Sequence, residues 1–329
     1  MISQDIIEKT RKIFIEELKN LEEGKRVQIN KLNIGSGSLY RLIFDYKNVG
    51  RDSQYKEFCE EIKPFLNKID FTGIDFSLFR CHSFYEKRGV DFSGTKGITI
   101  NPQTIIEKDL SHCKFSGVRF IGSFNDVRID NSDFTGSVGA RIAPFDIKSH
   151  CLSECKFSGV EFIGSFGYVR VENCDFSGSR GAVINPQKIN FKDLSNCNFG
   201  NVKFSGQFHG VKISGSKFSN SIGAVINPQT VYNRDLSYCN FRGVKFVGPF
   251  DATKICNTDF TGAIGVVINP QTIYNKDLSN CKFNGVRFAG PFDGVYDSDS
   301  DYTGSYNGAI SDGNRLKEEI KKLIRRSNM

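Results

Sequence analysis

The chain has 329 residues, a formal net charge of +7 and 39% hydrophobic residues, which is enough apolar material for a buried core. Charged residues interrupt the N-terminal stretch MISQDIIEKTRKIF, and no segment reaches the roughly 18 apolar residues that a membrane helix needs. Composition therefore argues against a secretion signal or a membrane span, and predicts a soluble cytoplasmic protein.

The N-terminal region shows the spacing of amphipathic helices. Apolar residues stand at Ile6, Ile7, Phe14, Leu18 and Leu21, with charged residues between them. Residues 53–65 resemble a second short helix, and residues 27–48 are a candidate for additional strands. We therefore predict that residues 1–65 form a mostly helical N-terminal region.

From about residue 66 the sequence becomes repetitive. The stretch KDLSNCKFNGVRF recurs in similar form every 42 residues, in copies that begin at Lys108, His150, Lys192, Arg234 and Lys276. Prolines follow the same period, at Pro102, Pro144, Pro186, Pro228 and Pro270. Self-similarity at one fixed period, without insertions, predicts a repeat architecture.

Large apolar residues recur mostly every five residues within one repeat, as at Val231, Leu236, Phe241 and Phe246. A step of five fits neither the helical period of about 3.6 nor the strand period of 2, so the chain is expected to turn after each step. A smaller residue stands two positions before most of these centres, as Cys239 does before Phe241. Each side is therefore predicted to have two inward positions, one large and one small.

This pattern resembles the pentapeptide-repeat family, whose A(D/N)LxX units form a right-handed, four-sided parallel β-helix. CNFRG, TDFTG and CKFNG take the place of that unit here, with Phe favoured over Leu and with Cys, Thr or Val favoured over Ala. The resemblance covers about residues 66 to 310. It implies a mainly β domain over residues 66–312.

Four sides of five residues imply coils of about twenty residues. Each 42-residue repeat is then two coils plus a small insertion, which the eight-residue step through TGAIGVVI locates at the same corner each time. Stacking at about 4.8 Å predicts roughly eleven to twelve coils and a rod of roughly 55 Å.

Two columns of side chains are predicted to fill the core. The small column contains Cys113, Cys155, Cys197, Cys239 and Cys281. The large column contains Phe115, Phe157, Phe199, Phe241 and Phe283. Cysteines two coils apart are separated by roughly 10 Å, which is beyond disulfide reach, and no His stands in their column to complete a metal site. We therefore predict core fillers in a reducing compartment, with no metal and no cofactor.

The charged residues of two faces show no catalytic pattern. Opposite charges mostly alternate from coil to coil, as at Lys114 and Asp133, which predicts pairs that set register and solubility. The four histidines lack metal-ligand spacing, and neither a GxSxG motif nor a phosphate-binding glycine loop is present. We therefore predict that the protein is not an enzyme.

One further face has basic residues without neighbouring acids along most of its length. The candidate partner-binding residues on it are Arg119, Arg141, Lys203, Lys245 and Arg287. Glu161 interrupts this series, and valines stand between its later members. The face is predicted either to dock an acidic partner or to be an ordinary solvated surface.

A column beside this face conflicts with the five-residue frame. Lys108, His150, Lys192, Arg234 and Lys276 occupy the small position that is predicted to point inward. Either these side chains reach outward past a corner, or the frame is interrupted at this point.

Residues 313–329 place Leu316, Ile320 and Leu323 on one face of a predicted amphipathic helix. An open β-helix exposes strand edges, so both terminal regions are predicted to cap it. Pairing of two copies through a terminal helix is the alternative, and the N-terminal region could instead be a functional domain on a β-helical stalk.

Several pentapeptide-repeat proteins imitate DNA and bind type II topoisomerases, which requires an acidic surface. Residues 71–312 instead carry 25 basic and 23 acidic residues, a net charge of +2. The phenylalanines are committed to the core, which also argues against stacking on nucleic-acid bases. We therefore predict a non-enzymatic protein-interaction scaffold, and retain modulation of a gyrase-type topoisomerase by DNA mimicry as the alternative.

Overall fold

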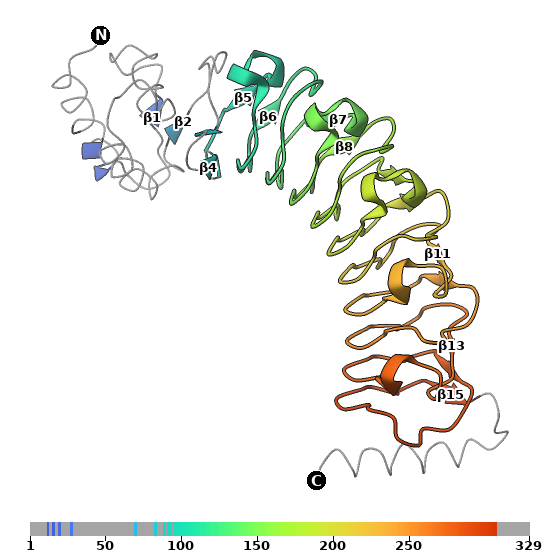
Figure 1. The fold of residues 1–329 in the computed structure, drawn as a ribbon. Coiled ribbons are helices and arrows are strands. Elements are labelled where there is room, and N and C mark those ends of the chain that lie inside the picture. The colour runs from blue at the N-terminus through green and yellow to red at the C-terminus, as the bar shows by residue number, and fades with distance from the viewer. Residues whose placement is uncertain are drawn as a thin grey trace. The chain divides into compact units, whose positions relative to one another are not determined.

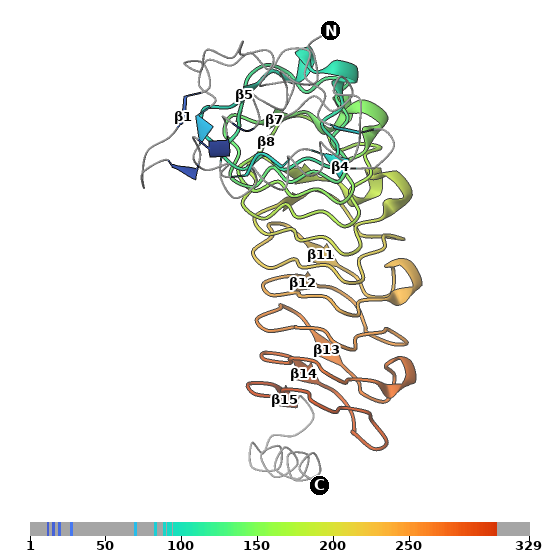
Figure 2. The same ribbon diagram turned by 90° about the vertical axis from the view of Figure 1, so that its left-hand side faces the viewer.

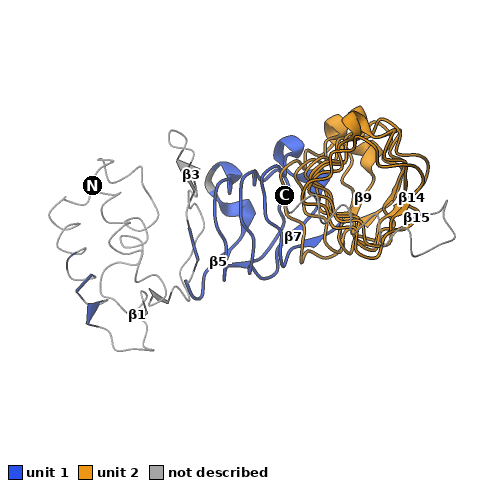
Figure 3. Cartoon of the chain, turned by 90° about the horizontal axis from the view of Figure 1, so that it is seen from below, with its two compact units in different colours: residues 1–163 blue, residues 164–329 orange. Residues whose placement is uncertain are grey.

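The computed structural model describes residues 91–93 and 95–307, together with isolated residues and short strands between positions 12 and 89. Two compact units are present, Met1–Ile163 (unit 1) and Gly164–Met329 (unit 2), which Figure 3 colours separately. Most of the predicted N-terminal helical region, the start of the repeats near Leu66 and the predicted C-terminal helix lie outside the described residues.

Unit 1 begins with two small sheets. Strand β1 (Val27–Gln28) pairs in parallel with β2 (Ile69–Asp70), and β3 (His82–Ser83) pairs antiparallel with β4 (Arg88–Gly89). The repeats that follow contain the strands β5 (Thr99–Ile100), β6 (Arg119–Phe120), β7 (Arg141–Ile142) and β8 (Glu161–Phe162). The 3₁₀ turns are η4 (Pro102–Thr104), η5 (Ile106–Lys108), η6 (Pro144–Asp146) and η7 (Lys148–His150).

Unit 2 repeats the same sequence of elements. Its strands are β9 (Val183–Ile184), β10 (Lys203–Phe204), β11 (Val225–Ile226), β12 (Lys245–Phe246), β13 (Val267–Ile268), β14 (Arg287–Phe288) and β15 (Tyr306–Asn307). Its 3₁₀ turns are η8 (Pro186–Lys188), η9 (Asn190–Lys192), η10 (Tyr232–Arg234) and η11 (Tyr274–Lys276). Within each unit, successive turns of the chain, which we call coils, stack one on another in both views of the ribbon (Figures 1 and 2).

The stacked coils pair in parallel and in a regular register. In unit 2, Asp193 pairs with Lys212 of the next coil, and Lys217 pairs with Asn240 of the coil after that. The second of these pairs spans a longer stretch of chain than the first. In unit 1, the pairs Lys114 with Asp133 and Asp133 with Lys156 show the same alternation of a shorter and a longer spacing. Each repeat is therefore two coils of unequal length, and the predicted parallel β-helix is confirmed.

Phenylalanine rings fill the interior of each unit. Phe199, Phe218 and Phe241 in unit 2 are fully buried, and their ring centroids follow one another at 5.2 and 5.7 Å. Phe246 meets the ring of Phe241 edge to face at 5.0 Å. Contacts of this kind are favourable beyond the area that they bury. The repeated use of aromatic side chains at inward positions thus explains the bias in composition.

The extra residues of each repeat form a glycine bulge within the TGAIGVVI-type segment. Ile264 pairs with Lys245 of the preceding coil, whereas Val267 pairs with Arg287 of the following coil. Gly265 lies between them with φ of +77°, and a Cβ atom there would lie 2.7 Å from the carbonyl oxygen of Phe246. Only glycine adopts this backbone conformation without strain in so little space.

The five-residue frame is interrupted at the column that begins with Lys108. Its members end 3₁₀ turns with left-handed φ values of 47 to 50°, and each follows a residue that is also left-handed. Their side chains are half-buried or exposed. The prediction of an inward position is therefore wrong here, because two consecutive left-handed residues rotate the backbone out of the frame.

The Asn-Pro-Gln motif ties one coil to the next. In unit 2, Asn227 Oδ1 accepts the N–H of Gln229 at 3.1 Å, which fixes the start of the turn. The side-chain amide of Gln229 then donates to the carbonyls of Pro249 and Asp251, at 3.2 and 2.6 Å. Both donors of this amide are used, which explains why glutamine follows the proline in most repeats.

We expect Gly265→Ala to destabilise the protein more than Gly262→Ala does. Both glycines have positive φ, but only the Cβ at position 265 meets a backbone oxygen, since nothing lies within 4 Å of the Cβ at position 262. The left-handed backbone costs each variant about 1 to 2 kcal/mol, and the close contact adds to that cost at position 265. Urea unfolding followed by circular dichroism measures the difference. Equal midpoints for the two variants would contradict the bulge geometry.

Candidate interaction surface

The unit 1 part of the candidate basic face is partly neutralised. Arg141 Nε lies 3.0 Å from Glu161 Oε2, in the coil that follows. Arg119 lies in register between Thr99 and Val138, and its side chain is exposed. The two predicted site residues of unit 1 thus differ, because one forms an ion pair and the other is flanked by uncharged residues.

The unit 2 part alternates cations with apolar side chains. Lys203 lies in register between Val183 and Ile222. Lys245 lies in register between Val225 and Ile264. Arg287 lies in register between Val267 and Tyr306. We call these nine residues the apolar-basic stripe.

The apolar members of the apolar-basic stripe are open to solvent. Ile222 and Ile264 are 60% and 59% exposed, and the three valines are each about two-fifths exposed. Lys203, Lys245 and Arg287 are also exposed, and none of the ion pairs found between described residues includes them. An exposed, contiguous series of this kind differs from the scattered apolar residues of an ordinary surface.

Another face of unit 2 shows the opposite arrangement. Lys212 Nζ lies 3.3 Å from Asp193 Oδ2 and 5.4 Å from the centre of the Tyr232 ring. Burial raises the pKa of Asp193, but hydrogen bonds from Ser195 and Lys212 outweigh that effect and hold the pKa below its ordinary value. A carboxyl group that stays ionised and paired acts structurally, not as a general acid.

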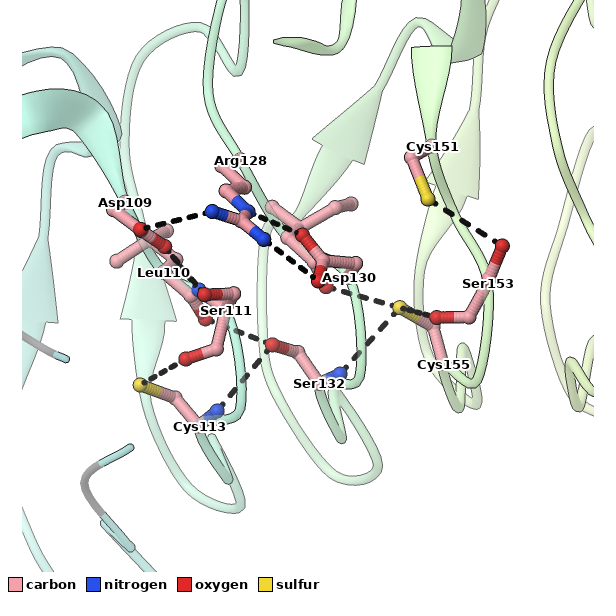
Figure 4. A network of polar contacts seen from close by, with 11 residues as sticks. Asp109, Leu110, Ser111, Cys113, Arg128, Asp130, Ser132, Cys151, Ser153 and Cys155 are labelled. Carbon is pink, nitrogen blue, oxygen red and sulfur yellow. Dashed lines mark hydrogen bonds and ion pairs between the residues drawn. The ribbon is translucent and has the colours of Figure 1, made fainter. Parts of the chain in front are cut away.

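The small inward column forms a hydrogen-bonded network in unit 1 (Figure 4). Ser132 Oγ donates to the carbonyl of Leu110 at 2.8 Å and accepts from the N–H of Cys113 at 3.3 Å. The N–H of Ser132 reaches Cys155 Sγ at 3.5 Å, and that thiol donates to the carbonyl of Ile129 at 3.0 Å. The column thus supplies donors to backbone carbonyls of preceding coils.

The same role is repeated in unit 2. Cys239 Sγ donates to the carbonyl of Ile213 at 3.0 Å, and Thr258 Oγ1 donates to the carbonyl of Leu236 at 2.8 Å. Sequence reasoning assigned this column to small size alone. The missed signal is that Cys, Ser and Thr are all donors, whereas alanine, which is equally small, is absent from the column.

Burial keeps these thiols protonated. Burial raises the pKa of Cys197, Cys239 and Cys281 to about 12, and it also raises that of Cys155. A protonated, enclosed thiol is neither a nucleophile nor a metal ligand. Among residues 91–93, 95–307 and the described pieces before them, no group of His, Cys, Asp or Glu is arranged to hold a metal ion.

No helix in the described part of the chain is long and apolar enough to span a membrane.

No family model matches the sequence, and no curated protein matches it.

Several solved structures are similar to this chain. One is HetL from the cyanobacterium Nostoc sp. strain PCC 7120, a pentapeptide repeat protein involved in regulation of heterocyst differentiation, at 13% identity and a TM-score of 0.20. The match covers 72% of this chain and 86% of HetL. The chain resembles pentapeptide-repeat proteins.

Two trypsin-treated forms of QnrB1, a plasmid-mediated fluoroquinolone resistance protein, are also similar. Each is 14% identical, with TM-scores of 0.18 and 0.17. The matches cover 71% and 69% of this chain, and 98% and 96% of those chains. The parallel β-helix of this chain is shown by its own coil spacing and by the hydrogen bonds between its coils.

We expect the free energy of unfolding to fall as pH rises from about 9 toward 12. Thiols with a raised folded-state pKa stabilise the native state below the ordinary thiol pKa, and this contribution is lost as pH rises through the folded-state value. Urea unfolding at several pH values measures the slope. The control replaces Cys197, Cys239 and Cys281 with Ser, which keeps a donor but does not titrate in this range. If the variant shows the same pH dependence of the free energy of unfolding as the wild type, the thiols are not its cause.

Proposed function

We propose that the protein is a non-enzymatic scaffold that binds another protein along the apolar-basic stripe of unit 2. The observation that supports this proposal is the contrast between two faces of the same unit. On one face Lys212 is paired with Asp193, whereas on the other Lys203 and Lys245 are flanked by exposed valine and isoleucine. Cations that form no ion pair with another described residue, and that stand beside apolar side chains, favour an acidic partner.

The proposed scaffold is a right-handed, four-sided β-helix with helical caps at both ends, working in the reducing cytoplasm. Backbone hydrogen bonds between coils and aromatic packing make such a body rigid, so the side chains of one face keep fixed spacings. A rigid surface loses little entropy on binding, which suits a docking function.

DNA mimicry is less well supported by the described residues. A mimic presents carboxylates at phosphate-like spacing without neutralising cations, but Asp133, Asp193 and Asp235 each lie within 4.0 Å of a lysine amine. A supercoiling assay with a gyrase-type topoisomerase tests this alternative directly. Inhibition or protection of that enzyme at stoichiometric amounts would favour mimicry over the scaffold.

The scaffold proposal predicts that a charge-reversal variant loses its partner. A quantitative pull-down from the host lysate compares the wild type with the Lys203→Glu, Lys245→Glu, Arg287→Glu variant. Like charges at a docking surface are expected to reduce recovery of the specific partner about ten-fold or more.

The matched control is Lys188→Glu, Lys217→Glu, Arg242→Glu, which makes the same change in net charge at exposed positions outside the apolar-basic stripe. The control should recover the partner as the wild type does, and circular dichroism should show the same β-rich spectrum for all three proteins. Equal recovery by the stripe variant and the wild type would refute the assignment of this surface.

A further inference from the structure

The spacing of the cations in the apolar-basic stripe restricts the geometry of a partner more closely than their charge does. Each cation is followed by the next one after a full repeat, which is two coils along the stack. Coils that pair in parallel lie about 4.8 Å apart, so successive cations lie about 9.6 Å apart along the stacking direction of unit 2. A partner that contacts all three must present acidic groups with nearly the same period.

An α-helix has a matching period. Seven residues of helix rise about 10.5 Å, and in a supercoiled helix seven residues return to the same face. Over the two intervals between Lys203 and Arg287, the mismatch amounts to about 2 Å. Long lysine and arginine side chains readily accommodate an offset of this size.

An extended strand does not match the stripe. Three residues of strand rise about 10 Å, but side chains three positions apart point to opposite faces. Acidic side chains spaced to meet successive cations would therefore point in turn toward the protein and toward the solvent.

The apolar residues next to each cation of the apolar-basic stripe provide a second set of contacts for a partner. Each cation has an exposed apolar residue in the coil before it and in the coil after it, as Lys245 has Val225 and Ile264. On a helix, residues three or four positions from an acid lie on the same face, about 5 Å along the axis, which is the distance to these apolar neighbours. Nucleic acid would leave the apolar residues without a partner.

We propose that the apolar-basic stripe of unit 2 binds an acidic amphipathic helix with one carboxylate per heptad and an apolar residue three or four positions away. The inference rests on the proposed scaffold function and adds the chemistry of the partner. Helices that lie on a complementary surface are a general mode of peptide recognition, with anchors spaced by three, four and seven residues. The partner helix lies along the stacking direction and contacts three repeats of the same Val-cation-apolar unit.

The test uses the full chain and synthetic peptides. The probe is a four-heptad helical peptide with Glu at one heptad position and Leu three and four positions away, and the control peptide has the same composition in scrambled order. Isothermal titration calorimetry is expected to show binding at least about ten-fold tighter for the heptad peptide than for the scrambled peptide. Equal affinities would overturn the proposal.

Charge exchange gives a second readout. The Lys203→Glu, Lys245→Glu, Arg287→Glu variant should lose the acidic peptide and gain affinity for a peptide in which Lys replaces each Glu. The Lys188→Glu, Lys217→Glu, Arg242→Glu control should behave as the wild type does. If circular dichroism shows that the stripe variant is fully folded and it still binds the acidic peptide, the proposal is overturned.

Two further probes separate the proposal from other occupants. Vesicles containing one-third phosphatidylserine and a 20-base-pair DNA duplex should bind more weakly than the heptad peptide does at physiological salt. Tighter binding of either probe through the same three cations would overturn the helix assignment. If the peptide fails but the pull-down still depends on the stripe, the scaffold stands and its partner is not an acidic helix.

Discussion

Parallel hydrogen bonding between successive coils is the constraint on which the rest of the structure depends. The alternation of shorter and longer coils places Asp193 beside Lys212 and Lys217 beside Asn240, and the same register is found in both units. A shift of one residue would exchange inward and outward side chains throughout a coil. The buried Phe column and the glycine bulge both enforce this register, one through packing and the other through backbone conformation.

Much of this architecture can be predicted from the sequence, because each inward position is repeated several times. The 42-residue period, the Phe column and the bulge at TGAIGVVI all follow from the apolar spacing alone. The turn at Lys108 and its equivalents could not be predicted in this way. These pairs of left-handed residues contain no glycine, and only Asn233, Asn275 and His150 among them are of a type enriched in that conformation, so the sequence marks the turn in some repeats but not in all.

The surface was harder to predict than the core. The basic residues and the valines between them were found from their period, but Ile222 and Ile264, which stand within the apolar run of the TGAIGVVI-type segment, were not assigned to this face. Only the bulge shows which members of that run point outward, because Gly265 separates Ile264, which faces solvent, from Val266, which is buried. The donor role of the Cys and Ser column was missed for a similar reason, since its acceptors are backbone carbonyls that side-chain patterns do not show.

The central claim is that coil register places each cation of the apolar-basic stripe directly between two apolar side chains. Cross-linking of engineered cysteine pairs tests it most directly, because a disulfide requires Cα atoms within about 7 Å. The account predicts that Lys245→Cys with Ile264→Cys forms an intramolecular disulfide under mild oxidation, as mass spectrometry would show. Val225→Cys with Ile264→Cys, two coils apart, should form none. The reverse outcome would contradict the register and the surface derived from it.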